Sequence, residues 1–293
     1  MAPVELKRRL PPWFKVRTPG GPNFVQLHNL LRESELHTVC EEARCPNIGD
    51  CWERRSATFM ILGDICTRAC RYCAVTSGKP LGLDLEEPER LARTVARLGL
   101  RYCVITSVNR DDLPDGGAFV FAQCVLKIRE QLPECKVETL IPDFKGAGLK
   151  SMMRARPDVL NHNIETVQRI FHSVRAKGDY AYSLELLRQV KELDPSMVTK
   201  SGMMVGLGET WDEIFQTMSD LRAVDCNLLT IGQYLRPSQK HIAVDRFYTP
   251  QEFIELREEG IRMGFSHVAA GPLVRSSYHA DEQYAAATSQ VPA

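Results

Sequence analysis

The first feature of this sequence that could do chemistry is a group of six cysteines near the N-terminus. The chain has 293 residues and ten cysteines, and six of them lie between Cys40 and Cys73, where an even distribution would place about one. They form two triplets, with C-x4-C-x5-C spacing at Cys40, Cys45 and Cys51, and C-x3-C-x2-C spacing at Cys66, Cys70 and Cys73. Because thiolates bind both zinc and iron–sulfur clusters, each triplet is a candidate metal site.

The later triplet suits a four-iron, four-sulfur (4Fe–4S) cluster in which one iron has no protein ligand. Three thiolates close together on a loop can hold three of the irons. The fourth iron can then bind S-adenosylmethionine (SAM), whose reductive cleavage releases a 5′-deoxyadenosyl radical. A zinc site is the alternative, because C-x2-C is a common zinc spacing, although the sequence lacks the paired C-x2-C knuckles that usually complete one.

The earlier triplet is less diagnostic when it is taken alone. No fourth cysteine follows it before the later triplet begins, and His37 could complete a zinc site with its three thiolates. The other cysteines of the chain are scattered. Two of them, Cys103 in an apolar run and Cys124 on a predicted helix, are more typical of buried, unreactive thiols.

The residues after the earlier triplet alternate between strand-like and helix-like patterns. Apolar runs of strand length occupy residues 58–63, 102–107, 136–142, 159–163, 199–206 and 228–234. Between them apolar residues recur at helical spacing, as at Leu184, Leu187 and Val190. Strand followed by helix six times predicts parallel strands, arranged as a partial barrel or as an open, doubly wound sheet. Either sheet binds ligands at the carboxyl ends of its strands, and the first run leads directly to Cys66.

The segments on either side of this repeat are less regular. Residues 1–55 are rich in Pro, Gly and Arg, with one short helical candidate at residues 25–42. The apolar stretch at residues 267–274 could be a short strand or a loop. The tail from Ala285 is small and polar, and it is predicted to be disordered.

Composition limits the partners and the compartment. Lys and Arg together number 37, as do Asp and Glu, so we expect neither nucleic acid nor a membrane as a partner. No apolar run approaches the ~18 residues of a membrane span, and Pro11 and Pro12 stand where a secretory signal would be apolar. The sequence therefore predicts a soluble, cytoplasmic protein, in whose reducing surroundings the cysteines do not form a disulfide framework.

Together the two triplets resemble those of the lipoyl synthase family of the radical SAM superfamily, which carries this pair in this order. Further similar segments are residues 106–112 (TSVNRDD), 137–143 (VETLIPD), 161–165 (NHNIE), 204–209 (MVGLGE) and 275–280 (RSSYHA). The resemblance implies an α/β fold with a partial (β/α)6 TIM-like barrel, the first of the two arrangements that periodicity left open. It also implies three parts: an N-terminal extension (1–55) with the auxiliary-cluster cysteines, a barrel core (56–265), and a C-terminal extension (266–293) with the Arg-Ser-Ser-Tyr motif.

The resemblance also implies a reaction and its cofactors. Lipoyl synthases are sulfurtransferases that insert two sulfur atoms, at C6 and C8 of an octanoyl chain on a lysine of a lipoyl carrier protein or domain. We therefore expect two 4Fe–4S clusters, with SAM as co-substrate and the auxiliary cluster as sulfur donor. The implied partners are the octanoylated carrier, an electron donor such as flavodoxin or ferredoxin, and an iron–sulfur carrier that resupplies the cluster.

Individual residues receive roles from the same resemblance. Cys66, Cys70 and Cys73 are the expected ligands of the radical SAM cluster, and the auxiliary cluster is expected on Cys40, Cys45, Cys51 and Ser277. A serine alkoxide is a hard ligand for iron, so that bond should be the easiest to release. From the residues alone, capping of a turn is the more common role for Ser277.

SAM contacts are expected at the ends of strands. Asn163 and Glu165 suit ribose hydroxyls because they offer a donor and an acceptor side by side, although helix capping explains them equally well. Asn109, Glu138 and Arg175 are candidates for the amino and carboxylate groups of the methionine part.

Two other interpretations remain at this stage. Other sulfur-inserting radical SAM enzymes, such as biotin synthases and methylthiotransferases, place the auxiliary cluster differently and lack this combination of motifs. Outside enzymes, a zinc-stabilised binding module could use the six clustered cysteines structurally.

Overall fold

One sheet of eight strands forms the centre of the computed structural model, which describes residues 10–289. Each strand lies beside the next one along the chain, and β2 to β8 are all parallel, whereas β1 pairs antiparallel with β2 at one edge. The strands are β1 (His37–Thr38), β2 (Thr58–Ile61), β3 (Tyr102–Ser107), β4 (Lys136–Leu140), β5 (Val159–Asn161), β6 (Val198–Val205), β7 (Leu228–Gln233) and β8 (His267–Gly271).

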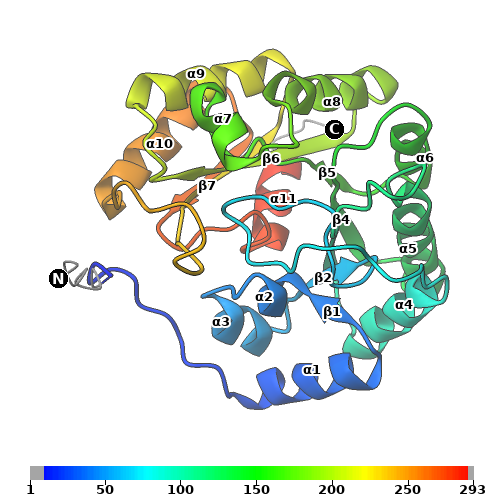
Figure 1. Ribbon diagram of the computed structural model, residues 1–293. Helices are drawn as coiled ribbons and strands as arrows, with labels where there is room; N and C mark the ends of the chain where they lie inside the picture. The colour runs from blue at the N-terminus through cyan, green and yellow to red at the C-terminus, as the bar shows by residue number, and fades with distance from the viewer. Residues whose placement is uncertain (1–9, 290–293) are drawn as a thin grey trace.

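Helices follow every parallel strand, and those after β2 to β7 lie along the outer side of the sheet (Figure 1). Those of the six βα units are α4 (Glu87–Leu98), α5 (Ala118–Gln131), α6 (Ala147–Ala155), α7 (Gln168–Val174), α8 (Tyr180–Leu193), α9 (Trp211–Ala223) and α10 (Pro250–Arg262). The other helices are α1 (Pro22–Glu33), α2 (Val39–Glu42) and α3 (Ile48–Glu53) before the sheet, and α11 (Ala280–Thr288) after β8. The predicted partial (β/α)6 barrel is confirmed, and residues 267–271 add a seventh parallel strand.

Local sequence explains where the helices begin. Thr210 and Thr249 start α9 and α10 with capping boxes, in which each threonine hydroxyl accepts from the backbone N–H three residues later. Strand residues such as Ile105 are fully buried against helix residues such as Val125, because a parallel sheet is covered on both faces. Among residues 10–289, no helix combines the length and the apolar character needed to cross a membrane.

The structure corrects the expected helix at residues 25–42. Helix α1 begins earlier, with Pro22 at its first position, and ends at Glu33. Glu35 then takes a left-handed backbone conformation with φ of 50°, which an α-helix cannot continue through. Thr38 caps the new helix α2, because its hydroxyl accepts from the Glu41 N–H.

The tail was also predicted wrongly in its described part. Helix α11 continues to Thr288 rather than ending in disorder at Ala285. Tyr284 and Ala287 pack against Val159 and Leu228, the first residues of β5 and β7. The helix therefore covers the amino ends of the strands and is held by apolar contacts that the small, polar composition of the tail does not reveal.

The sheet does not close on itself, and the two terminal segments meet at its opening. The side-chain amide of Asn47 donates to the Leu273 carbonyl at 2.6 Å, and Arg54 Nη2 lies 2.7 Å from Glu282 Oε1. Figure 1 shows α2 and α3 beside the opening, across from the outer helices. Since β8 belongs to the same sheet, the boundary predicted at residue 266 does not separate an independent unit.

A buried ion pair crosses the inside of the barrel. Lys200 Nζ on β6 lies 3.0 Å from Glu138 Oε1 on β4, and both side chains are 0% exposed. Tyr102 and Asn161 also donate to the Glu138 carboxylate, at 2.8 and 3.0 Å. Burial lowers the pKa of Lys200, whereas the facing carboxylate stabilises its charged form. This network occupies the interior that apolar side chains fill elsewhere in the sheet.

Replacing Glu138 by leucine should lower the free energy of unfolding by about 3–5 kcal/mol, because the charge of Lys200 would stay buried without its partner. The matched control is Glu185→Leu, which breaks a pair with Arg188 in which both side chains are more than one-third exposed. That change should cost at most about 1 kcal/mol. Urea denaturation of both variants checks this, and equal losses would contradict the role of the buried pair.

Candidate active site

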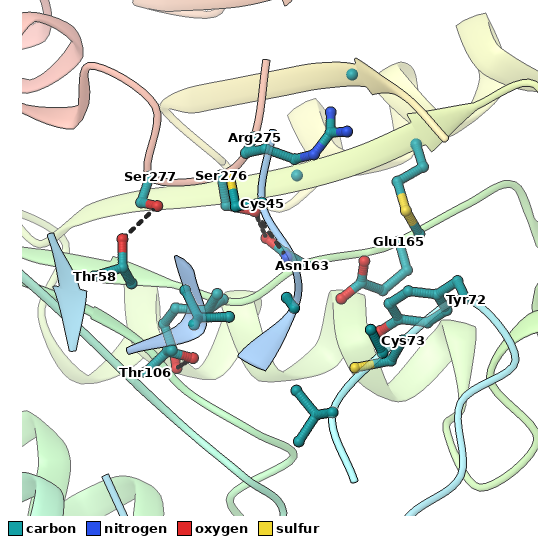
Figure 2. A pocket seen from close by; sticks show the side chains of 18 of the residues that line it. Cys45, Thr58, Tyr72, Cys73, Thr106, Asn163, Glu165, Arg275, Ser276 and Ser277 are labelled. Atoms are coloured by element: carbon teal, nitrogen blue, oxygen red, sulfur yellow. Dashed lines mark hydrogen bonds between the residues drawn. The ribbon is translucent and has the colours of Figure 1, made fainter. Parts of the chain in front are cut away.

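A cavity of about 510 Å³ opens at the carboxyl ends of the strands. Its wall includes Thr106 from β3, Leu140 from β4, Met204 from β6 and Gln233 from β7. Both cysteine triplets also line it, as do the SAM-contact candidates Asn109, Asn163, Glu165 and Arg175 and the serine Ser277. Figure 2 shows that Cys45, Cys73 and Ser277 reach the cavity from segments far apart in the sequence. Most of the candidate residues therefore lie together at the carboxyl ends of the strands, as predicted.

The earlier triplet lies on the short helices before the sheet. Cys40 is in α2 and Cys51 in α3, and the turn between them carries Cys45. Two backbone hydrogen bonds of 2.9 Å fix this turn, from the Cys45 N–H to the Cys40 carbonyl and from the Cys51 N–H to the Asn47 carbonyl. The indole N–H of Trp52 in α3 is buried and has no hydrogen-bond partner among the described residues, which leaves a donor that suits a thiolate ligand at this site.

The C-terminal serines enter the same cavity from the segment after β8. Thr58 Oγ1 donates to Ser277 Oγ at 2.6 Å, and Asn163 Nδ2 donates to Ser276 Oγ at 2.9 Å (Figure 2). Gly232 makes room for this segment, since a Cβ atom there would lie 2.1 Å from the Val274 carbonyl oxygen. The two serines are thus fixed to two different parts of the barrel, Ser277 to β2 and Ser276 to the segment after β5.

The later triplet lies on the loop after β2, as predicted. Backbone N–H groups of Arg68 and Asn109 donate to Cys66 Sγ at 3.4 and 3.3 Å. His241 Nε2 lies 2.9 Å from the Cys73 carbonyl oxygen, which ties the loop to the segment after β7. N–H donors directed at a sulfur stabilise its thiolate form.

Burial opposes ionisation of most of these thiols. It raises the pKa of Cys40, Cys51 and Cys73 to about 12, and it also raises the pKa of Cys45 and Cys70. At neutral pH these groups remain protonated unless a cation replaces the proton. Metal binding supplies that cation and releases the proton. The site therefore favours a positively charged metal centre.

The donor set fits two 4Fe–4S clusters better than a single metal ion. All cysteines are free thiols, and no three His, Cys, Asp or Glu side chains of residues 10–289 converge on one ion. In a cubane each thiolate binds a different iron, so the ligand sulfurs need not converge on one metal. The three thiols of each triplet and the hydroxyl group of Ser277 all line this one cavity.

Three of the SAM-contact candidates lie together on one wall. Glu165 has a φ of 68°, and burial raises the pKa of its carboxyl group, whereas Arg175 nearby lowers it. Asn163, Tyr72 and Glu165 all line the cavity (Figure 2). Arg175 is buried, and its Nη1 has no hydrogen-bond partner among the described residues, which leaves a donor for an anionic group.

Glu138 does not join these residues. It is absent from the cavity wall, and the lysine, tyrosine and asparagine partners described above occupy its carboxylate. The prediction that Glu138 contacts SAM is therefore not carried further, because a fully buried carboxylate with three partners has no free acceptor facing the cavity.

Sequence reasoning missed the residue that holds the later loop in place. Asp143 is 7% exposed and accepts from Arg175 Nη2 at 2.8 Å and from Arg68 of the cysteine loop. His162 Nε2 lies 3.4 Å from Asp143, but burial and the charge of Arg175 lower the pKa of this imidazole to about 4, so it is neutral. The segment VETLIPD was recognised, yet its last residue received no role because both arginines are distant in sequence.

Comparison with known proteins defines the class first. The model of the radical SAM superfamily matches residues 60–221. Solved structures of methylornithine synthase (TM-score 0.57, 14% identity, 70% of this chain and 61% of that one) and of the FeFe-hydrogenase maturase from Carboxydothermus hydrogenoformans (TM-score 0.58, 12% identity, 78% and 55%) share the fold. Fold and cavity together define a radical SAM enzyme.

The family follows from closer relatives. The model for the N-terminal domain of lipoyl synthase matches residues 3–45. Lipoyl synthases of Rubrobacter xylanophilus and Symbiobacterium thermophilum are both 58% identical to this chain, covering 93% and 96% of it and 86% and 89% of the relatives. That of Halalkalibacterium halodurans is 55% identical and covers 97% and 94%. The chain belongs to the lipoyl synthase family.

Family membership confirms several predictions. The protein is a radical SAM sulfurtransferase whose cofactors are two 4Fe–4S clusters, with SAM as co-substrate. It acts on an octanoylated carrier.

Replacing Asp143 by asparagine should loosen the cysteine loop, because Arg68 would keep only one of its two carboxylate partners. The matched control is Asp111→Asn, which removes the other carboxylate but at a side chain that is 39% exposed. Hydrogen exchange of residues 66–76 should accelerate by about tenfold or more in the Asp143 variant, and by less in the control, since buried charged hydrogen bonds contribute more. Equal exchange in the two variants would contradict this role of Asp143.

Proposed function

We propose that this enzyme inserts sulfur at C6 and C8 of a protein-bound N6-octanoyl-lysine, and that the auxiliary cluster donates both atoms. When bound, the cofactors supply a 5′-deoxyadenosyl radical, which can remove hydrogen from unactivated carbon, and sulfide for the new bonds. The observation that carries the proposal is that both cysteine triplets and Ser277 line one cavity. An alkyl chain placed there would be close to both ligand sets.

The ligand assignment follows the two cysteine triplets. We assign Cys66, Cys70 and Cys73 to the radical SAM cluster, since two backbone N–H groups already donate to Cys66 and no fourth protein ligand is needed. We assign Cys40, Cys45, Cys51 and Ser277 to the auxiliary cluster. The serine oxygen makes a harder, more easily released contact than a thiolate, which suits a cluster that is dismantled.

The remaining polar groups bind and orient SAM in this proposal. The unpartnered Arg175 Nη1 suits the carboxylate of the methionine part, because a buried guanidinium donor favours an anion. Asn163 and Glu165 suit the ribose hydroxyls, as a donor and an acceptor. Asn109 lies beside Cys66, where its side chain could reach the amino group next to the cluster.

The cavity also offers apolar surface for the octanoyl chain. Met60, Val108 and Ile141 are buried residues of its wall. Holding the chain against them removes water from the reacting carbons and fixes which methylene faces the radical. Their contribution is positional, since an alkyl chain offers no group for acid–base catalysis.

Three further features complete the proposal. Each radical requires one electron, so an electron donor such as flavodoxin or ferredoxin must dock near the later triplet. A consumed cluster requires an iron–sulfur carrier to rebuild it. We keep the prediction of a cytoplasmic location, which is supported by the need to keep six ligand thiols reduced.

Anaerobically reconstituted protein should contain about eight irons and eight acid-labile sulfides per chain, as two 4Fe–4S clusters require. Replacing Cys40, Cys45 and Cys51 together by alanine should lower the content to about four irons, since one cubane is lost. This variant should still cleave SAM but add no sulfur to an octanoyl-lysine peptide, as read by mass spectrometry. Sulfur insertion by the variant would contradict the assignment of the sulfur donor.

Without a source of new clusters, each polypeptide should form about one lipoyl group, because its auxiliary cluster is used up. The measurement is product per enzyme at long times, with excess SAM, reductant and octanoyl-lysine peptide. Sustained production of several lipoyl groups per chain, with no iron or sulfide added, would show that the cluster is not the sulfur source.

A further inference from the structure

The segment that carries the two serines is attached to the barrel at two places. Ser276 receives its hydrogen bond from Asn163, after β5, whereas Ser277 receives its bond from Thr58, the first residue of β2. Asn163 stands among the proposed SAM contacts. Thr58 is neither a proposed cluster ligand nor a proposed SAM contact, although it is in direct contact with the proposed ligand Ser277.

Thr58 is in direct contact with one of the four proposed ligands of the auxiliary cluster. Its side chain donates to Ser277 Oγ at 2.6 Å. It is 5% exposed and belongs to a strand whose four residues are all buried, so its position is fixed. Thr58 is 219 residues away from Ser277 in the chain, and no local pattern relates the two.

We propose that Thr58 is the positioning residue for Ser277: its hydroxyl group holds the serine oxygen at the auxiliary cluster and keeps a donor beside it when the bond to iron is released. The proposal rests on the assignment of Ser277 as a cluster ligand. It adds to that assignment the group that directs the ligand, which is a side chain of the barrel rather than of the C-terminal segment.

The chemistry of the two hydroxyl groups supports the proposal that Thr58 positions Ser277. A serine side chain has three staggered rotamers, and the hydrogen bond from Thr58 selects one of them. Figure 2 shows the two oxygen atoms facing each other at the edge of the cavity. A serine bound to iron as an alkoxide can only accept, and Thr58 is oriented to donate.

The same hydrogen bond also serves the released serine. If the bond to iron were broken, Thr58 would remain as the hydrogen-bond partner of the serine oxygen. No other residue between 10 and 289 hydrogen-bonds to Ser277 Oγ. The partner of a metal ligand often determines how strongly that ligand holds the metal, so removal of Thr58 should weaken this corner of the cluster.

The test measures iron retention by the enzyme loaded with both clusters, without turnover. Thr58→Val removes the hydroxyl group but keeps the shape of the side chain. A colorimetric ferrous-iron chelator should take iron from the auxiliary cluster about tenfold faster in this variant, as expected for loss of a ligand's partner. After mild oxidation, electron paramagnetic resonance should show a three-iron cluster in the variant.

Three other variants make the result specific. Thr58→Ser restores a hydroxyl group and should retain iron as the unmodified enzyme does. Thr106→Val removes the hydroxyl group of another threonine of the cavity wall, which donates to the Leu140 carbonyl instead, and should also retain iron. Ser277→Ala removes the ligand itself and should lose iron at least as fast as Thr58→Val.

The outcomes separate this proposal from the function on which it rests. If Ser277→Ala loses iron rapidly while Thr58→Val does not, the role of Thr58 is wrong and the ligand assignment remains. Failure of Thr58→Ser to restore retention would also overturn the proposal, because packing rather than the hydroxyl group would then matter. If Ser277→Ala retains all its iron, the ligand assignment itself is wrong. Should the valine variant not fold, Thr58→Ala gives the same test.

Discussion

The structure depends on the way in which an incomplete barrel is closed. Eight strands in sequential order leave an opening between the β1–β2 edge and β8, and buried strands cannot leave such an opening to water. The N-terminal and C-terminal segments meet there, through Asn47 with Leu273 and through Thr58 with Ser277. Closing the barrel in this way also places Cys40, Cys45, Cys51 and Ser277 at the cavity. The contacts that close the barrel therefore also bring together the proposed ligands of the auxiliary cluster.

The second consequence is electrostatic. Burial makes these thiols difficult to ionise, and it raises the pKa of Cys40, Cys51 and Cys73. A bound iron centre would offset this cost, and the backbone N–H groups that donate to Cys66 would stabilise its thiolate. The same partial burial therefore favours the cluster-bound form of the site, on which the proposed reaction depends.

The sequence was informative wherever chemistry is encoded locally. The six strand runs and the strand-end position of Cys66 were predicted, because they depend on neighbouring residues. The cysteine spacings, from which the cluster sites were inferred, are local in the same way. Thr58, Asp143 and the Glu138–Lys200 pair act through partners on other strands or loops, which spacing does not specify. Helix α11 was missed for the same reason, because Tyr284 is held by residues at the starts of distant strands. Glu138 was predicted to contact SAM because its motif was recognised. The motif does not specify the direction in which its side chain points.

The central claim is that both sulfur atoms leave a cluster held in the same cavity as the radical source. The most direct measurement is a single turnover with enzyme whose clusters were assembled from ³⁴S sulfide, in a medium whose sulfur is unlabelled. The account predicts that mass spectrometry finds ³⁴S at both C6 and C8 of the lipoyl product. Unlabelled sulfur at either carbon would contradict it.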